Sequence, residues 1–386
     1  MNFYKHIETE LAKIKSDNLY RNFKELSSKS GAFVEYNGKQ VLQMSSNNYL
    51  GLAEDHRITE AVIKAVEKYG MGSTGSRLIS GTHKLHMELE EKLAELKGTE
   101  KAIVFSTGYA ANIGTISAFL TEKDAVYSDE LNHASIIDGI KLSRANKFIY
   151  KHCDTQDLER LLEENHQNYR FNVIITDSIF SMDGDIAPLK EIVDLKEKYN
   201  GILFLDEAHA FGVYGEKGQG LAHELGLSDK IDIQMGTLSK AAGSEGGYIC
   251  GKSEIIEYLK NKSRSFVFST APSIATTAAS IKAVEIIKDD FELRKKLREN
   301  IEYFKTGLLN YGFDVSLSKS AIFCLKFDNI QKTMQISQDL LEKHKIMASC
   351  IRPPTVKAPR IRLCTMALHT KEDLDYVLEK LKIYSI

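Results

Sequence analysis

Short apolar runs alternate with amphipathic stretches through the middle of the chain, from Lys101 to about Gly251. The runs have the length and the Val, Ile and Phe content of buried strands. They are AIVF (102–105), AVY (125–127), NVIITD (172–177), ILFLD (202–206) and YIC (248–250), with a further run from Ile231 to Met235. The stretches between most of them are helical, such as Asp154–Glu164, whose leucines fall on one face. This alternation predicts an α/β fold with a mainly parallel, doubly wound sheet.

The pattern changes on both sides of this region. On the N-terminal side we expect a helix over 3–28, a strand hairpin over 31–44 that turns at Asn37-Gly38, and two helices that end at Gly70 and Gly98. On the C-terminal side we expect a long helical region from Pro272 to about 309, strands near 313–327 and 361–364, and a closing helix over 371–383. The chain is thus predicted to have an N-terminal arm (1–50), a large domain (51–285) and a smaller α+β C-terminal domain (286–386).

Composition excludes several classes of protein. The formal net charge of -2 gives no electrostatic reason to expect nucleic acid or an anionic membrane as a partner. The five cysteines are scattered, which favours reduced thiols in a cytoplasmic protein over a disulfide or zinc framework, and we expect no metal. The N-terminus lacks the apolar core of a signal peptide, and no run of eighteen apolar residues predicts a membrane span.

In a doubly wound sheet, ligands bind at the carboxyl ends of the strands. Polar or glycine-containing segments follow three of the predicted strands at this edge: Ser106–Tyr109, Ser178–Asp183 and Asp206–His209. The run that ends at Gly236 leads into Thr237, Ser239 and Lys240 among small residues. Close packing desolvates a lysine and makes its amine a nucleophile, although a solvated lysine in a glycine-rich loop would have the same sequence.

Together these residues suit pyridoxal 5'-phosphate (PLP), whose chemistry needs a lysine amine, a carboxylate for the pyridine nitrogen, a phosphate cradle and a stacked ring. Lys240 and Asp206 supply the first two. At about 4 Å and an effective dielectric constant near 20, a carboxylate favours the protonated pyridine by roughly 4 kcal/mol. The other candidates are the amides of Gly108 and Tyr109 and the hydroxyls of Thr237 and Ser239 for the phosphate, His133 for stacking, and His209 and Ser181 for the ring oxygen.

Each of these residues has an ordinary structural interpretation when it is taken alone: Asp206 as a helix cap, the histidines as hydrogen-bonded structural residues, and Gly108 as a turn. A competing motif is Gly246–Ser253, which fits the P-loop pattern, and Asp206–His209 resembles the acidic box of a helicase. We reject an ATP-driven motor because Tyr248–Cys250 reads as a strand where a P-loop needs a loop, and because the acidic box precedes the lysine motif.

The order of motifs resembles the α-oxoamine synthases, a family of fold-type I PLP enzymes that join an amino acid to an acyl thioester with loss of carbon dioxide. The resemblance covers nearly the whole chain. It rests on SSNNYLGL (45–52), GSTGSRLISGT (72–82), STGYAAN (106–112), DELNHASIIDG (129–139), DSIFSMDGDIAPL (177–189), LDEAHAFGVYGEKGQG (205–220) and TLSKAAGSEGGY (237–248).

Within the family, Ile351–Val356 is similar to the signature of the biotin-pathway member, which condenses L-alanine with a pimeloyl thioester of coenzyme A or of a carrier protein. The alternative within the family is a glycine C-acetyltransferase, which uses glycine and acetyl-CoA. Outside catalysis, the alternative is a silent partner subunit. Lys240 argues against the latter, since such a subunit has no need of the lysine.

The resemblance also implies residue roles. Lys240 would bond to the cofactor, Asp206 would pair with its ring nitrogen and His133 would stack on the ring. Further roles are Ser181 and His209 at the ring oxygen, Gly108, Tyr109 and Thr237 at the phosphate, Arg362 with Asn47 at the amino-acid carboxylate, and Arg21 and Thr355 at the acyl substrate. The family is dimeric with shared active sites, so we expect a homodimer in which Gly72–Thr82 and Ser269-Thr270 reach the neighbouring cofactor.

Overall fold

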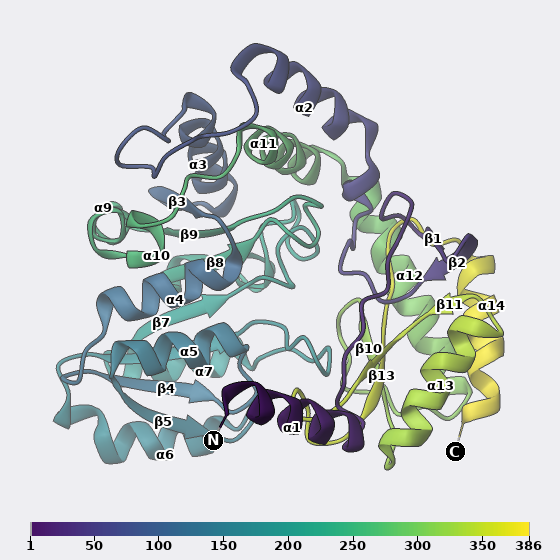
Figure 1. Cartoon of the computed structure of the whole chain (residues 1–386). Coiled ribbons are helices and arrows are strands. Elements are labelled where there is room, and N and C mark those ends of the chain that lie inside the picture. The colour runs from purple at the N-terminus through teal and green to yellow at the C-terminus, as the bar shows by residue number, and fades with distance from the viewer. Residues whose placement is uncertain (1, 386) are drawn as a thin grey trace. The chain divides into compact units, whose positions relative to one another are not determined.

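A computed structural model describes residues 2–385, which form two compact units (Figure 1). The large unit comprises Asn48–Ser181 and Asp185–Leu297. The small unit comprises the described residues up to Asn47, Met182–Gly184, and the described residues from Arg298 onward. Among the described residues, no helix is long and apolar enough to cross a membrane.

The large unit is built on a seven-stranded sheet in the order β3-β9-β8-β7-β6-β4-β5. Its strands are β3 (Lys101–Phe105), β4 (Ala125–Asp129), β5 (Asn146–Tyr150), β6 (Asn172–Asp177), β7 (Ile202–Asp206), β8 (Ile233–Thr237) and β9 (Gly247–Gly251). Only β9 runs antiparallel to its neighbours. The prediction of a mainly parallel, doubly wound sheet is confirmed.

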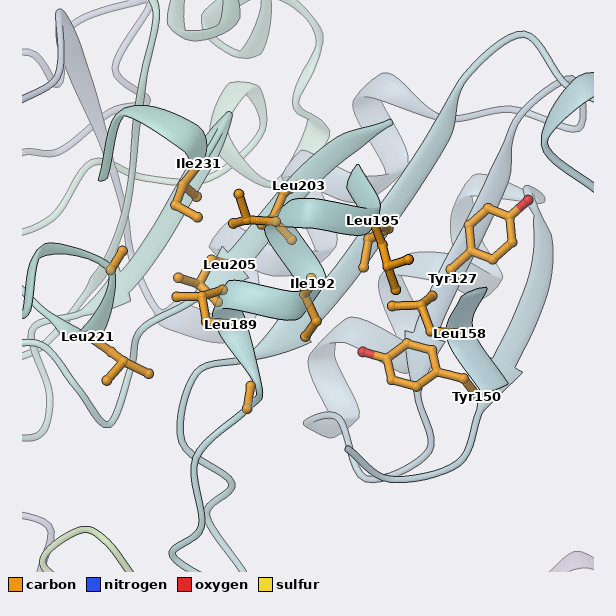
Figure 2. Close-up of a cluster of buried hydrophobic side chains, with 14 of the residues drawn as sticks. Tyr127, Tyr150, Leu158, Leu189, Ile192, Leu195, Leu203, Leu205, Leu221 and Ile231 are labelled. Atoms are coloured by element: carbon orange, nitrogen blue, oxygen red, sulfur yellow. The ribbon is translucent and has the colours of Figure 1, made fainter. Parts of the chain in front are cut away.

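Alternate side chains of the buried strands enter two separate cores, which is why helices cover both faces. On β7, Leu203 and Leu205 pack in one core and Phe204 packs in the other. Figure 2 shows the first core, where Leu203 and Leu205 lie with Leu189 and Ile192 of α7 (Leu189–Lys198). The helices α4 (Gly108–Phe119), α5 (Ala134–Ser143) and α9 (Ser253–Lys262) contribute to the second core.

The remaining helices of the large unit surround this sheet. They are α2 (His56–Tyr69), α3 (Lys84–Lys97), α6 (Thr155–Asn165), α8 (Leu221–Glu224), α10 (Arg264–Val267) and α11 (Ile274–Asp289), with short 3-10 turns at Leu52–Glu54, His166–Asn168 and Ser228–Lys230. The expected ends of α2 and α3 at Gly70 and Gly98 are confirmed. The helical region predicted from Pro272 to 309 is interrupted at Asp290, where α11 ends and α12 (Phe291–Asn310) begins.

The small unit contains two three-stranded sheets, β1-β2-β11 and β10-β13-β12. Their strands are β1 (Phe33–Tyr36), β2 (Lys39–Gln43), β10 (Ile322–Lys326), β11 (Ile346–Met347), β12 (Ser349–Ile351) and β13 (Arg360–Cys364), and the helices are α1 (Phe3–Ser16), α13 (Ile330–Glu342), α14 (Lys371–Leu381) and the short turn Lys382–Tyr384. The predicted hairpin is confirmed, with Asn37 and Gly38 at positive φ between its strands.

Two predictions for this unit are wrong in part. The first helix ends at Ser16, not near residue 28, because Asn18 takes a left-handed conformation and the amides of Asn18 and Leu19 bond back to the carbonyls of Lys15 and Ile14. The strand predicted near 313–327 begins only at Ile322. The residues before it turn instead, and the amide of Lys319 donates to the carbonyl of Gly184.

Candidate active site

The carboxyl ends of β6 and β7 place two buried aspartates next to each other. Asp177 and Asp206 are register partners on parallel strands, and each is at most 5% exposed. The carboxylate of Asp206 accepts the amide of Ala208 at 2.8 Å on Oδ1 and the side-chain amide of Asn112 at 2.8 Å on Oδ2. Its orientation is therefore fixed from two sides.

Burial and the negative charge of Asp206 raise the pKa of Asp177 well above its usual value, although a hydrogen bond from the His133 amide acts in the opposite direction. That amide donates to Asp177 Oδ2 at 2.7 Å. Sequence reasoning missed this residue, although the same rule of strand ends selects it.

Lys240 lies in the turn that follows β8, and its Nζ is 3.0 Å from Nε2 of His209. The other ring nitrogen of His209, Nδ1, is 2.7 Å from the buried hydroxyl of Tyr49. If the Lys240 ammonium donates to Nε2, the proton of the neutral imidazole is on Nδ1 and points at Tyr49. Lys240 and His209, which were predicted to share a site, do lie together, and Tyr49 is a member that the sequence did not reveal.

The turn that carries Lys240 needs its small residues. Gly243 has φ +61°, and a Cβ there would lie 2.3 Å from the backbone nitrogen of Ala53. The amide of Ser244 closes the turn by donating to the carbonyl of Leu238 at 2.9 Å. The lysine is thus held by a backbone loop in close contact with another segment, in agreement with the expectation of close packing.

His133 is the N-cap of α5, and its Nδ1 lies 2.7 Å from the hydroxyl of Ser135. Although the residue is exposed, desolvation by the surrounding protein lowers the pKa of its imidazole. The charge of Asp206 raises this pKa and that of Lys240 lowers it, which places His133 within electrostatic reach of both groups. His133 is therefore neutral at physiological pH.

The first turn of α4 has the form of an anion cradle. Thr107 caps the helix, so the amides of Gly108 and Tyr109 lie in the first turn, where backbone donors have no partner within the helix. A Cβ on Gly108 would come within 3.1 Å of Met235 and 3.4 Å of Thr237, so a larger residue at this position would crowd those two side chains. The side chain of Tyr109 points elsewhere, because its hydroxyl bonds to Asp138.

The structure gives less direct support for the roles predicted for Thr237 and Ser181. The hydroxyl of Thr237 donates to the carbonyl of Gly246 at 2.8 Å and lies 2.8 Å from the hydroxyl of Ser239. The hydroxyl of Thr237 must break its bond to the carbonyl of Gly246 before it can donate to a phosphate. Ser181 lies in the turn after β6, between the paired residues Ile179 and Ile186.

The predicted substrate residues form two pairs within the small unit. Arg362 is 5% exposed, and its Nη2 donates to Oδ1 of Asn47 at 3.0 Å. Nη2 of Arg21 donates to the hydroxyl of Thr355 at 3.3 Å. Arg21 and Thr355 line a cavity of about 640 Å³ together with Lys24, Arg352 and apolar side chains.

The two loops that were predicted to reach a second cofactor are joined in this chain. Ser76 pairs with Thr270, and the amide of Ala271 donates to the carbonyl of Gly75 at 2.9 Å. Arg77 anchors the first loop through a buried bidentate contact with Glu90, at 2.7 and 3.0 Å. Apolar side chains are exposed in and next to these loops: Ile79, in the first loop, at 85%, and Phe268, directly before the second, at 73%.

The P-loop interpretation fails on the structure. Gly247–Gly251 is strand β9, paired on both sides with β3 and β8. The backbone of these residues is engaged in the sheet and does not form a loop that can wrap a phosphate.

A second, partly buried cluster of titratable side chains lies at the ends of β4 and β5. Nδ1 of His152 is 2.9 Å from Asp129 and Nε2 is 2.6 Å from Asp185, while the sulfur of Cys153 lies nearby. Asp129, His152 and Cys153 bring potential metal ligands within 4.8 Å of one another. Both ring nitrogens of His152 already face a carboxylate. The histidine therefore links Asp129, which precedes His133, to Asp185, which follows Ser181.

These two carboxylates give His152 a measurable pH signature. Burial lowers the pKa of His152, but hydrogen bonds from the ring to Asp129 and Asp185 outweigh it and raise the pKa to about 12. Because the folded value is above the unfolded one, the stabilisation is complete below about pH 6.5 and is lost as the pH rises toward the folded value. We expect the stability advantage of the wild type over His152→Gln to shrink between pH 6.5 and 8.5 by roughly 1–2 kcal/mol, which allows for partial exposure of the ring.

Urea unfolding at the two pH values measures this effect. His166→Gln is the matched control, because the His166 ring bonds to the carbonyl of Leu162. If the wild type and His152→Gln lost the same stability between the two pH values, the proposed contribution of the bonds from His152 to Asp129 and Asp185 would be contradicted.

Comparison with known proteins agrees with this fold. The family model for aminotransferase class I and II matches residues 39–381, so the chain belongs to this family. Within it, the relatives place the chain among the α-oxoamine synthases. The 8-amino-7-oxononanoate synthase of Thermoanaerobacter pseudethanolicus is 47% identical over 374 residues, which cover 97% of this chain and 95% of that protein.

Solved structures give the same result. A serine palmitoyltransferase variant from S. paucimobilis with a bound PLP–myriocin aldimine superposes with a TM-score of 0.93 at 28% identity, covering 99% of this chain and 98% of the other. The 8-amino-7-oxononanoate synthase from Francisella tularensis has a TM-score of 0.78 at 27% identity, covering 89% and 97%. The architecture is that of the fold-type I PLP enzymes, as the sequence predicted.

Proposed function

We propose that this protein is a PLP-dependent acyltransferase that condenses L-alanine with a pimeloyl thioester. The products are 8-amino-7-oxononanoate, carbon dioxide and the free thiol, and the reaction belongs to biotin biosynthesis. The observation that carries the proposal is the meeting of Lys240, His209, His133 and Asp206 at one edge of the sheet. The choice of substrates is supported by eight curated relatives, 43–47% identical over 96–99% of this chain, which are named 8-amino-7-oxononanoate synthase or a numbered or putative form of it.

The residues of the large unit fit PLP. The buried carboxylate of Asp206 suits a protonated ring nitrogen, and the backbone amides in the first turn of α4 suit a phosphate. When bound, PLP supplies an electron sink that stabilises negative charge on the α carbon of an amino acid. Ser181 and His209 would contact the ring oxygen, Thr237 and the amide of Tyr109 the phosphate, and His133 the ring face.

The side chains of this protein would bind the substrates and move the protons. Lys240 Nζ is the proposed acceptor of the α proton, and His209, held by Tyr49, keeps that amine oriented. Arg362 with Asn47 would bind the carboxylate of alanine, since a guanidinium fork matches both oxygens. Arg21 and Thr355 would contact the acyl chain in the 640 Å³ cavity.

The test is thiol release with two substrate pairs. We expect coenzyme A to appear with L-alanine plus pimeloyl-CoA and to appear far more slowly with glycine plus acetyl-CoA. The opposite preference would identify a glycine C-acetyltransferase. No release with either pair, by protein that holds PLP, would favour a silent subunit.

Arg362→Lys tests the proposed carboxylate site. Lysine keeps the charge but loses the second parallel hydrogen bond and the contact with Asn47, so we expect KM for alanine to rise about 10- to 100-fold. Steady-state kinetics with alanine varied at saturating acyl thioester measure this. Arg170→Lys is the control, because Arg170 makes a bidentate contact with Asp124 away from the proposed site. An equal rise of this KM in both variants would contradict the assignment.

We further propose a homodimer with shared active sites, formed through the paired loops at Gly72–Thr82 and Ser269-Thr270. Support comes from their exposed apolar side chains, because such side chains usually become covered. Ile79→Asp places a charge on the proposed interface and is expected to shift sedimentation toward monomer and to lower turnover together. Ile63→Asp, at a 52% exposed position on α2, is the control. A fully active monomeric wild type would refute this proposal.

We also propose that the protein acts in the cytoplasm. All five cysteines are free thiols, as expected for a reducing compartment.

A further inference from the structure

Asn112 contacts the carboxylate of Asp206 in the proposed cofactor site, and none of the residue roles predicted from the sequence includes it. It is on α4, is 1% exposed, and its Nδ2 donates at 2.8 Å to Asp206 Oδ2 and at 2.8 Å to the hydroxyl of Ser135. One amide group therefore contacts the carboxylate on β7 and the first turn of α5. The same helix presents Gly108, four residues earlier and thus on the same face.

The chemistry of the acceptors fixes the direction of these bonds. A carboxylate oxygen only accepts, so the nitrogen of Asn112 must face Asp206, and its Oδ1 is left buried without a hydrogen-bond partner among the described residues. The oxygen of Ser135 accepts the second proton of this amide. Its own proton is then available for Nδ1 of His133, 2.7 Å away, which also faces the amide of Ser135 at 3.3 Å.

The same reasoning sets the tautomer of His133. A nitrogen that accepts two hydrogen bonds carries no proton, so the neutral imidazole has its proton on Nε2. Buried polar atoms without a partner are rare in folded proteins, and the one on Asn112 calls for an explanation. An apolar side chain of similar size would remove the unpaired oxygen, but it would also take away the donor that Asp206 Oδ2 and the hydroxyl of Ser135 accept.

We propose that Asn112 is a positioning residue that fixes the carboxylate of Asp206 and, through Ser135, the Nε2–H tautomer of His133. One amide thereby aligns the group proposed for the ring nitrogen and the group proposed for the ring face. This inference rests on the proposed PLP site but not on the choice of alanine or the acyl donor. The cofactor would then meet both groups already oriented.

The first experiment measures PLP binding to the apoprotein by equilibrium dialysis. We expect Asn112→Leu to bind PLP about 10- to 100-fold more weakly, because Asp206 loses a charge-assisted hydrogen bond. Asn172→Leu is the matched control: Asn172 is a buried asparagine on β6 whose amide bonds to His166 and Tyr127, outside the site. It is expected to bind PLP within about twofold of the wild type.

The second experiment reads the tautomer directly. Nitrogen-15 NMR of the apoprotein, with the His133 signal assigned by its loss in His133→Gln, is expected to show the Nε2–H form in the wild type. Ser135→Ala removes the hydroxyl without touching Asp206 and is expected to yield a mixture of tautomers, as is Asn112→Leu. Should Asn112→Leu fail to fold, Ser135→Ala still tests the chain from Ser135 to His133.

The outcomes separate two kinds of failure. A wild type that does not bind PLP would overturn the proposed function. A wild type that binds PLP, together with Asn112→Leu that binds it equally well and keeps the Nε2–H signal, would overturn this inference alone. An Nδ1–H signal in the wild type would likewise overturn it.

Discussion

Lys240→Ala is expected to lower turnover at least about 10³-fold, because it removes the amine that we propose bonds to the cofactor and accepts the α proton. Lys240 is partly buried and its Nζ is held 3.0 Å from His209, so solvent would replace this amine inefficiently. The variant should also lose the covalent link to PLP. Borohydride treatment followed by mass spectrometry should add the mass of reduced PLP to the wild type and not to the variant.

Lys252→Ala is the control for this prediction. Lys252 is the lysine of the P-loop-like sequence, and it lies at the exposed N-terminus of α9. We expect its variant to keep both turnover and the PLP mass. A variant at Lys240 that keeps the mass, or loss of turnover only at Lys252, would remove the basis of the proposed function.

The sheet could be predicted because its strands are buried on both faces. Continuous apolar runs such as ILFLD mark such strands, and the residue that follows the run then marks the edge where ligands bind. The edge strand β5 was missed because only one face of it is buried: Asn146–Tyr150 alternates between partly buried and exposed positions. Its short length offered no second signal.

The strands β11 and β12 were missed for a related reason, and the helix α13 was missed for a different one. The two strands have only two and three residues, and they are held by pairing with β2 and β13. Such pairings join segments that are distant in the chain, and no local pattern records them. In α13 the buried residues recur at helical spacing, from Thr333 to Leu341, so the sequence of this element does carry a helical pattern.

The site divides in the same way. Residues that end strands or sit in glycine-rich turns, such as Asp206 and Lys240, were found from position alone. Asn112 and Tyr49 were not, because their importance depends on partners 94 and 160 positions away. A polar residue inside a helix has many ordinary explanations, and only the folded chain shows which acceptor it meets.

Glu207, between Asp206 and the histidine at 209, forms a buried ion pair with Lys97. Their side chains are 0% and 1% exposed, and Nζ of Lys97 bonds to Oε2 of Glu207 and to the carbonyl of Gln219. Oε1 of Glu207 accepts the amide of Ala222 at 2.9 Å. Gly220 has φ +124°, and a Cβ there would lie 2.5 Å from this carboxylate, so the backbone is closed around it.

Lys97→Met is expected to destabilise the fold by about 3–5 kcal/mol, because it leaves the carboxylate of Glu207 buried without its counter-charge. The double variant Lys97→Met with Glu207→Gln removes both charges and keeps an acceptor for the Ala222 amide. It is expected to recover at least about 2 kcal/mol of that loss. Urea unfolding of the three proteins under one set of conditions measures this, and Lys92→Met, at a partly exposed salt bridge to Glu285, is the control.

The same three proteins test whether the ion pair also supports the site. Glu207 is adjacent to Asp206 in sequence, and its own amide bonds to the carbonyl of Met235 on β8 at 2.8 Å. Movement of the uncompensated carboxylate toward water would therefore displace the end of β7, and we expect Lys97→Met to weaken PLP binding along with stability. If the double variant were no more stable than Lys97→Met, the cost would come from lost packing around the Lys97 side chain and not from the unpaired charge.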